Sequence, residues 1–286
     1  MSLTIGSGPF GQYPAGVFNF HLPSTTGVLY FEDSRRRMRA TFGGETVLDS
    51  SHAKLLHEHG QLPVYYFPEE EVRTDLLERT DHSTRCPHKG AATYWSLRVG
   101  DRLAANAAWG HPEPIEAGPD LSGYLAFYWD KLDAWLEEDE PAIVHARDPY
   151  HRVDILDSSR HVRVILGGEV IADTRRARAL FETGLPPRWY IPPEDVRTET
   201  LIASEKQTGC AYKGFASYRS VRVGGTVEED IVWSYPEPRR EAERIAGYLA
   251  FFNERVDIEL DGDREERPIT QWSRRATDAT PRLALQ

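Results

Sequence analysis

The segment Arg39-Ala-Thr-Phe-Gly-Gly-Glu-Thr-Val-Leu-Asp49 returns 124 residues later as Arg163-Val-Ile-Leu-Gly-Gly-Glu-Val-Ile-Ala-Asp173. In each copy, a Gly-Gly pair stands between two short runs of residues that either alternate between apolar and polar or are mostly apolar. Two adjacent glycines supply the positive φ angles of a two-residue turn, so each segment predicts a β-hairpin. Because the hairpin occurs twice, it sets a register for comparing the rest of the chain with itself.

That register holds without a gap from Asp33 and Asp157 to Phe127 and Phe251, and about 36 of the 89 positions from Arg39 to Phe127 are identical. Similarity at one fixed offset indicates a duplication. The offset is too long for a solenoid repeat, and 286 residues suffice for two domains of ordinary size. The predicted division is an N-terminal arm (1–27), a first repeat domain (28–129), a linker (130–152), a second repeat domain (153–261) and a charged C-terminal tail (262–286).

Both copies contain the same succession of short strands and glycine turns, which predicts a mainly β (α+β) fold of antiparallel sheets. Asp49 and Asp173 are N-cap candidates for one short helix in each copy, which would end at Gly60 or Gly184. A second kind of helix is predicted in the linker, where four large apolar residues have helical spacing and should be buried. These four are Trp129, Leu132, Trp135 and Leu136.

Composition argues against several classes of protein. A formal charge of −11 disfavours a general nucleic-acid binder, which normally presents a basic face. No run of 18 apolar residues is present to span a membrane, and the first 20 residues do not have the pattern of a signal peptide. With only two cysteines, Cys86 and Cys210, we expect a cytoplasmic protein with free thiols.

The densest shared motif is Thr84-x-Cys-x-x-Lys-Gly-x-x-x-Tyr94, which returns as Thr208-x-Cys-x-x-Lys-Gly-x-x-x-Tyr218. Lysine is rare in this chain, five residues against 29 arginines, yet Lys89 and Lys213 occupy matching positions. A lysine in this place offers a fixed cation to a ligand, or lowers the pKa of the neighbouring thiol. It equally suits a structural role, in which the cysteine packs as a small apolar residue and the lysine forms a local ion pair.

A tryptophan before Pro-x-Pro and a tyrosine in an aromatic strand also recur, and they complete the candidate site. A lysine next to aromatic side chains suits a small anionic or aromatic ligand in a pocket of each domain. Two alternatives remain open: an enzyme that uses the Cys-x-x-Lys cluster as a reactive thiol, and a purely structural or protein-interaction module. The candidate ligand-binding residues are Tyr66, Cys86, Lys89, Tyr94 and Trp109 in the first copy and Tyr190, Cys210, Lys213, Tyr218 and Trp233 in the second.

Motifs for cofactors and metals are missing from the sequence. It has no GxGxxG or GxxxxGK[ST] phosphate loop, no HExxH and no GxSxG. One cysteine per copy cannot build a Cys₄ zinc site. Histidines do not substitute, because His57, His88 and His111 are replaced in the second copy by Phe, Tyr and Tyr. We therefore expect no structural zinc, no cofactor and no histidine site common to both copies.

Taken together, these motifs make the chain resemble a tandem member of the family called domain of unknown function 427. The shared features are GGExxxD, Tyr-x-Pro-x-x-x-Val-Arg, Thr-x-Cys-x-x-Lys-Gly, Trp-x-x-Pro-x-Pro and Gly-Tyr-x-Ala-Phe, which extend over most of Val28–Asp261. The resemblance implies a β-tent fold, with two antiparallel sheets meeting at an angle and one short helix. Several β-tent relatives hold zinc between cysteine pairs, which this chain lacks. The family implies no established reaction.

Overall fold

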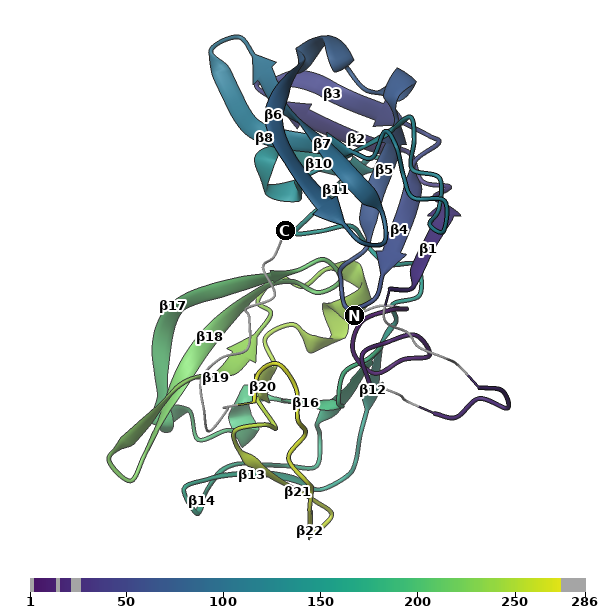
Figure 1. Cartoon of the computed structure of the whole chain (residues 1–286). Coiled ribbons are helices and arrows are strands. Elements are labelled where there is room, and N and C mark those ends of the chain that lie inside the picture. Colours follow the sequence, from purple (N-terminus) through teal and green to yellow (C-terminus); the bar gives the residue numbers. More distant parts are fainter. Residues whose placement is uncertain (1–2, 14–15, 22–26, 274–286) are drawn as a thin grey trace. The chain divides into compact units, whose positions relative to one another are not determined.

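The computed structural model describes residues 3–13, 16–21 and 27–273, and it separates into two compact units. The first unit ends at Tyr150 and the second begins at His151. Each unit contains one copy of the repeat, and we call them the first and the second domain (Figure 1). Both are mainly β and antiparallel, with one seven-stranded and one four-stranded sheet each.

The seven-stranded sheet of the first domain has the order β1-β4-β5-β9-β8-β7-β6, and its four-stranded sheet has the order β11-β10-β2-β3. All pairings between these strands are antiparallel. The strands are β1 (Leu29–Asp33), β2 (Met38–Phe42), β3 (Glu45–Ser50), β4 (Lys54–Glu58), β5 (Val64–Pro68), β6 (Leu77–Cys86), β7 (Gly90–Val99), β8 (Arg102–Gly110), β9 (Tyr124–Phe127), β10 (Ala134–Glu137) and β11 (Glu140–Ala142).

The second domain repeats this topology strand for strand, in the orders β12-β15-β16-β20-β19-β18-β17 and β14-β13-β21-β22. Its strands are β12 (Val153–Asp157), β13 (Val162–Leu166), β14 (Glu169–Thr174), β15 (Arg178–Glu182), β16 (Arg188–Ile191), β17 (Leu201–Cys210), β18 (Gly214–Val223), β19 (Thr226–Ser234), β20 (Leu249–Phe251), β21 (Asp257–Leu260) and β22 (Asp263–Arg264). The helices that the structure describes are short 3-10 turns: η1 (Glu69–Glu71), η2 (Thr74–Leu76), η3 (Trp129–Lys131), η4 (Pro193–Asp195), η5 (Thr198–Thr200) and η6 (Arg240–Ile245).

The β-hairpin predicted around each Gly-Gly pair is confirmed in both copies. Strands β2 and β3 pair across Gly43-Gly44, whose φ angles are 61° and 85°. Strands β13 and β14 pair across Gly167-Gly168, with φ angles of 58° and 86°. Positive φ at both central residues is the turn that matches the twist of a β-hairpin, and glycine adopts it without strain.

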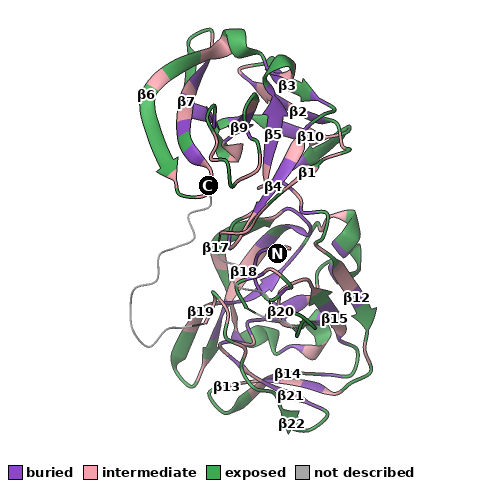
Figure 2. Cartoon of the chain, turned by 45° about the vertical axis from the view of Figure 1, so that its right-hand side comes forward, coloured by how far each residue is buried: buried purple, intermediate pink, exposed green. Residues whose placement is uncertain are grey.

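Each seven-stranded sheet carries apolar side chains on both faces. One face packs against the four-stranded sheet and makes the main core, which contains Met38, Phe67 and Leu97 in the first domain. The opposite face carries a smaller cluster around Leu56, Tyr66 and Leu121. Figure 2 shows the buried residues on the central strands, whereas β6 is exposed along most of its length. The candidate site lies on the second face.

The helix predicted after Asp49 and Asp173 is wrong in both copies. Residues 54–58 form β4, which pairs with β1 and β5, and residues 178–182 form β15 in the same way. In β4 the consecutive residues Leu55 and Leu56 contribute to opposite faces of the sheet. A strand buried on both faces reads as a continuous apolar run, which periodicity alone does not distinguish from a helix.

The linker helix is also wrong. Residues 134–137 form β10, which pairs with β2 and so adds to the first domain's four-stranded sheet. Leu132 and Trp135 are buried as expected, whereas Trp129 and Leu136 are only partly buried. The reason for burial is different: the Trp135 ring stacks on Trp129 at 4.4 Å between centroids and on Phe67 at 6.0 Å. Pairing with an existing sheet edge outweighs the local helical spacing.

Candidate functional site

The predicted aromatic residues form a row across neighbouring strands of each seven-stranded sheet. In the second domain Tyr190 on β16 is paired with Ala250 on β20, which is paired with Trp233 on β19. Trp233 is in turn paired with Tyr218 on β18. The first domain repeats the last step, with Tyr94 opposite Trp109. Residues in register on neighbouring strands share one face of the sheet, so these aromatics lie together.

The small alanine in this row lets the indole reach across to the tyrosine. In the second domain Trp233 Nε1 donates a hydrogen bond of 2.9 Å to the Tyr190 hydroxyl, and both residues are buried. Burial raises the pKa of Tyr190 well above its usual value of 10, and the same holds for Tyr66. Both phenols therefore stay neutral across the physiological range and act as hydrogen-bonding groups.

The Cys-x-x-Lys-Gly motif is the turn between two long strands. Cys86 ends β6, Gly90 begins β7, and the two are paired residues. Gly90 has a φ of 94°, and a Cβ there would lie 2.9 Å from the carbonyl oxygen of Glu113. The glycine is needed for the turn itself and for its close contact with the Trp-x-x-Pro-Glu-Pro segment. The turn thereby places the cysteine and the lysine at one end of the aromatic row.

The lysine of the motif contacts a glutamate on a distant strand. Lys89 Nζ donates to Glu58 Oε2 at 2.6 Å, and Lys213 makes the matching ion pair with Glu182. Four strand-to-strand steps separate β4 from β7 in the sheet order, which is roughly 19 Å in a flat sheet. A lysine side chain does not span that distance, so the sheet is curved, and the ion pair joins the hairpin tip to β4 across its concave face.

The two ion pairs differ in exposure. The side chains of Lys89 and Glu58 are 16% and 22% exposed, whereas those of Lys213 and Glu182 are 8% and 6% exposed. Burial alone would neutralise both members of the second pair, but their mutual attraction outweighs it. The pKa of Glu182 is lowered and that of Lys213 is raised, with Cys210 also favouring the charged lysine. The second pair is therefore a charged, enclosed contact.

Different residues cover the two pairs. In the second domain His151 Nε2 donates to Glu182 Oε1 at 3.1 Å, and the His151 ring stacks on Tyr212 at 3.8 Å between centroids. Gly27 occupies the matching position in the first domain and has no side chain to give. Its backbone lies against His88, the counterpart of Tyr212, because a Cβ on Gly27 would come within 2.5 Å of that ring. The first pair consequently lacks the imidazole cover.

His111 approaches the first pair from the loop after β8. It is 3% exposed, and its Nδ1 lies 3.2 Å from the Ala91 carbonyl oxygen, which places the donor proton there. Burial and the neighbouring Lys89 lower the pKa of His111 below 6.5, so the imidazole is neutral at pH 7. The second domain has Tyr235 here, whose pKa burial raises far above 10.

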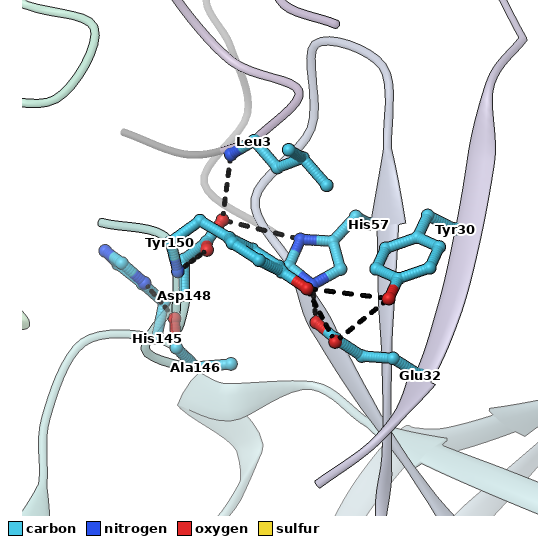
Figure 3. Close-up of polar contacts among 8 residues, drawn as sticks. All are labelled: Leu3, Tyr30, Glu32, His57, His145, Ala146, Asp148 and Tyr150. Atoms are coloured by element: carbon cyan, nitrogen blue, oxygen red, sulfur yellow. Dashed lines mark hydrogen bonds and ion pairs between the residues drawn. The ribbon is translucent and has the colours of Figure 1, made fainter. Parts of the chain in front are cut away.

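A separate polar cluster lies on the other side of β4. His57 is fully buried, and its Nε2 donates to Glu32 Oε1 at 2.8 Å (Figure 3). Its Nδ1 lies 3.4 Å from Asp148 Oδ2, which is ion-pair distance without good hydrogen-bond geometry. Asp148 also accepts from the backbone of Leu3 at 3.2 Å and of Tyr150 at 2.7 Å. The cluster therefore fixes residues 148–150 and the start of the chain to the first domain.

Charge holds this cluster together. Burial alone would lower the pKa of His57, but the carboxylates of Asp148 and Glu32 raise it above 6.5. The pKa of Asp148 is lowered despite its burial, because His57 and two backbone N–H groups stabilise the anion. The second domain has Phe181 in place of His57 and has no such cluster at that position. The only sign of this cluster in the sequence is a histidine in an apolar run.

The structure thus brings the predicted site residues of each copy to one face of one sheet. The structure adds a glutamate to each site, because the shared lysine pairs with Glu58 in the first copy and with Glu182 in the second. Sequence reasoning missed the covering residues His151 and Tyr212, because His151 fell in the predicted linker. Whether these residues take a ligand stays a prediction.

The fold and the site define a tandem, mainly β protein with one matched polar cluster per domain. The family model described as Domain of unknown function (DUF427) matches residues 30–138 and again 154–262, and the chain belongs to this family. No curated protein matches the chain. Among the described residues, no helix is long and apolar enough to cross a membrane, and no three His, Cys, Asp or Glu side chains gather as a metal site would require. The expected absence of zinc stays a prediction.

Proposed function

We propose that the first domain binds a small organic molecule that carries a carboxylate or carbonyl oxygen beside a flat ring. The observation that carries the proposal is the partial exposure of the Lys89–Glu58 pair. An ammonium group has three donors, and within the described part of the chain Lys89 Nζ makes one hydrogen bond, to Glu58. Two donors are therefore available to an acceptor on a ligand.

The aromatic row supports a flat ring as the second part of the proposed ligand. Trp109 is partly buried, and its ring packs on Tyr128 at 4.5 Å between centroids. Tyr66 belongs to the same row, and burial together with the neighbouring Glu58 and Cys86 raises the pKa of its hydroxyl. A flat ring against the indole, with its polar group toward Lys89, would use both features. Because Glu58 already balances the lysine charge, a neutral carbonyl compound is as suitable as a carboxylate.

For the second domain we propose a structural role for the matching cluster. Lys213 and Glu182 are enclosed, and His151 occupies the second oxygen of the glutamate. A ligand would first have to displace the His151–Tyr212 stack. The purely structural alternative thus has a specific observation in its favour, and that observation concerns one copy.

The test uses benzoate, benzamide and cyclohexanecarboxylate as probes, with binding followed by ligand-observed NMR on the full chain. We expect benzoate and benzamide to bind the wild type and to bind Lys89→Met at least several-fold more weakly. Lys54→Met is the matched control, because Lys54 is a partly exposed lysine of the same domain that also pairs with a carboxylate, that of Asp33. No binding of any probe, or equal loss in both variants, would contradict the proposal.

A further inference from the structure

The second domain has a cavity between its two sheets. In the first domain, side chains of that domain fill the equivalent space. A cavity of about 380 Å³ lies at the β12 edge, with Leu156, Phe181 and Trp189 in its lining. Leu156 is 55% exposed and Phe181 is 43% exposed, although both are large apolar residues on paired strands. A volume of this size falls in the range of small-molecule sites.

The equivalent place in the first domain is the polar cluster of Figure 3. Glu32 and His57 stand at the positions of Leu156 and Phe181, and residues 148–150 pack over them. In the second domain the chain after β22 takes another course over its described length. Thr270 there bonds to Glu254, and Trp272 packs on Phe252. Consequently, no described segment of the second domain covers Phe181 as Asp148 and Tyr150 cover His57.

The charged residues at the rim of the cavity determine which ligand charge it favours. Two of its charged residues already have partners: Arg160 is bonded to Asp261 at 2.7 Å, and Asp157 pairs with Arg244 at 2.6 Å and with Arg178 at 3.3 Å. Glu265 and Glu266 also line the cavity, and within the described residues neither side chain has an ion-pair partner. The opening therefore combines an apolar floor that contains Trp189 with two glutamates at its mouth that have no ion-pair partner among the described residues.

We propose that this cavity is a second ligand site, which takes a small organic cation with an aromatic or branched aliphatic body. The body would contact Leu156 and Phe181 and approach Trp189, while the ammonium group would lie near Glu265 and Glu266. An amine is favoured over an acid because the two glutamates attract a cation and repel an anion. The site is independent of the Lys89 cluster, which lies in the other domain.

The experiment compares three probes that share one ring and differ in charge: phenethylamine, 2-phenylethanol and phenylacetate. Binding is measured by ligand-observed NMR on the full chain at low ionic strength. We expect the order amine, alcohol, acid, and we expect the Glu265→Gln/Glu266→Gln double variant to lose roughly tenfold in amine affinity without change for the alcohol. Both glutamates are exposed, so the double variant should fold.

Two further variants complete the test. Phe181→Ser, at an exposed position, should weaken the amine and the alcohol alike, because it removes apolar contact. Lys89→Met should leave the affinities for the amine and the alcohol unchanged and remove any phenylacetate bound at the Lys89 cluster, which separates this site from the proposed function. Absence of amine binding, a preference for the acid in the Lys89→Met chain, or equal amine affinities in wild type and Phe181→Ser would overturn the proposal.

Discussion

The two domains share one topology and one glutamate–lysine pair, yet they enclose that pair differently. In the second domain His151 and Tyr212 stack over Glu182 and leave the pair 6–8% exposed. In the first domain a glycine stands in place of His151, and the pair is 16–22% exposed. Different covering residues therefore leave the same ion pair enclosed in one domain and partly exposed in the other. Duplication allows this division, since one copy can maintain the architecture while the other keeps access to solvent.

The inter-sheet opening shows the reverse division. The first domain fills it with His57, Asp148 and Tyr150, and the second leaves Phe181 exposed at the edge of a cavity. Each copy is thus closed where the other is open.

The largest expected effect is on the enclosed ion pair. Lys213→Met leaves Glu182 buried without its cation, and we expect the second domain to lose about 3–5 kcal/mol of unfolding free energy. Lys89→Met should cost the first domain about 1 kcal/mol or less, because solvent screens its partner. Hydrogen exchange of peptides from each domain in increasing urea measures both. Equal losses in the two domains would show that the difference in exposure has no energetic meaning.

A second buried pair occurs in the second domain alone. Arg188 donates two hydrogen bonds of 2.7 Å to Glu254, and their side chains are 5% and 0% exposed. The first domain has Val64 and Asp130 at these positions. Arg188→Met should destabilise the second domain by about 3 kcal/mol or more, because it strands a buried carboxylate.

The double variant Arg188→Met/Glu254→Leu should recover most of that loss in the same urea experiment, since two apolar residues of similar size need no partner. Thr270 would then lose its acceptor on Glu254, so recovery should fall short of complete. A double variant no more stable than the single one would count against this account of the pair.

A smaller effect is expected from pH, and it should appear in the first domain. The folded pKa of His57 is raised above 6.5, so the stability that its charge contributes is fully present below pH 6.5 and is lost as the pH rises through the folded value. Asp148 affects stability at low pH. Its pKa is lowered, so the stability that its carboxylate contributes is present above pH 3.8 and is lost on acidification. Between pH 6 and pH 9 the first domain should lose on the order of 1 kcal/mol.

Urea unfolding of the first domain at these two pH values checks this expectation. His57→Phe, which installs the residue of the second domain, should remove the loss between pH 6 and pH 9 while lowering stability at both, and the lowered pKa of His111 should then leave a small gain over that range. A variant that keeps the wild-type pH dependence would assign the effect to another group.

Much of this architecture was accessible from the sequence, because the repeat fixed the register and the Gly-Gly pairs fixed the hairpins. The errors have one physical source. Leu55-Leu56 in β4 and Trp135-Leu136 in β10 were given to helices, yet each segment pairs with a strand far away in the chain. Local spacing carries no information on such pairing. The same holds for His151 and Asp148, whose roles depend on side chains that only the folded sheet brings near.

The residues of the candidate site could be predicted from the sequence more readily than the residues that cover its ion pairs. A rare lysine retained at matching positions identified Lys89 and Lys213, and a tyrosine and a tryptophan in matching strands identified the aromatic row. What distinguishes the copies could not be read this way, because a comparison of two repeats highlights what they share. Gly27 and His151 differ, as do His88 and Tyr212, and these residues lie beside the two ion pairs.

The rates at which Lys89 and Lys213 react in the native protein show whether the two ion pairs differ in accessibility. Limited acetylation with acetic anhydride, quantified for each lysine by peptide mass spectrometry, compares Lys89 with Lys213 in one sample, with the urea-unfolded chain as reference. The difference in cover predicts that Lys89 is acetylated well before Lys213. The variant Tyr212→Ala, which removes the ring stacked on His151, should raise the acetylation rate of Lys213 toward that of Lys89. Equal rates for the two lysines, or faster reaction at Lys213, would contradict it.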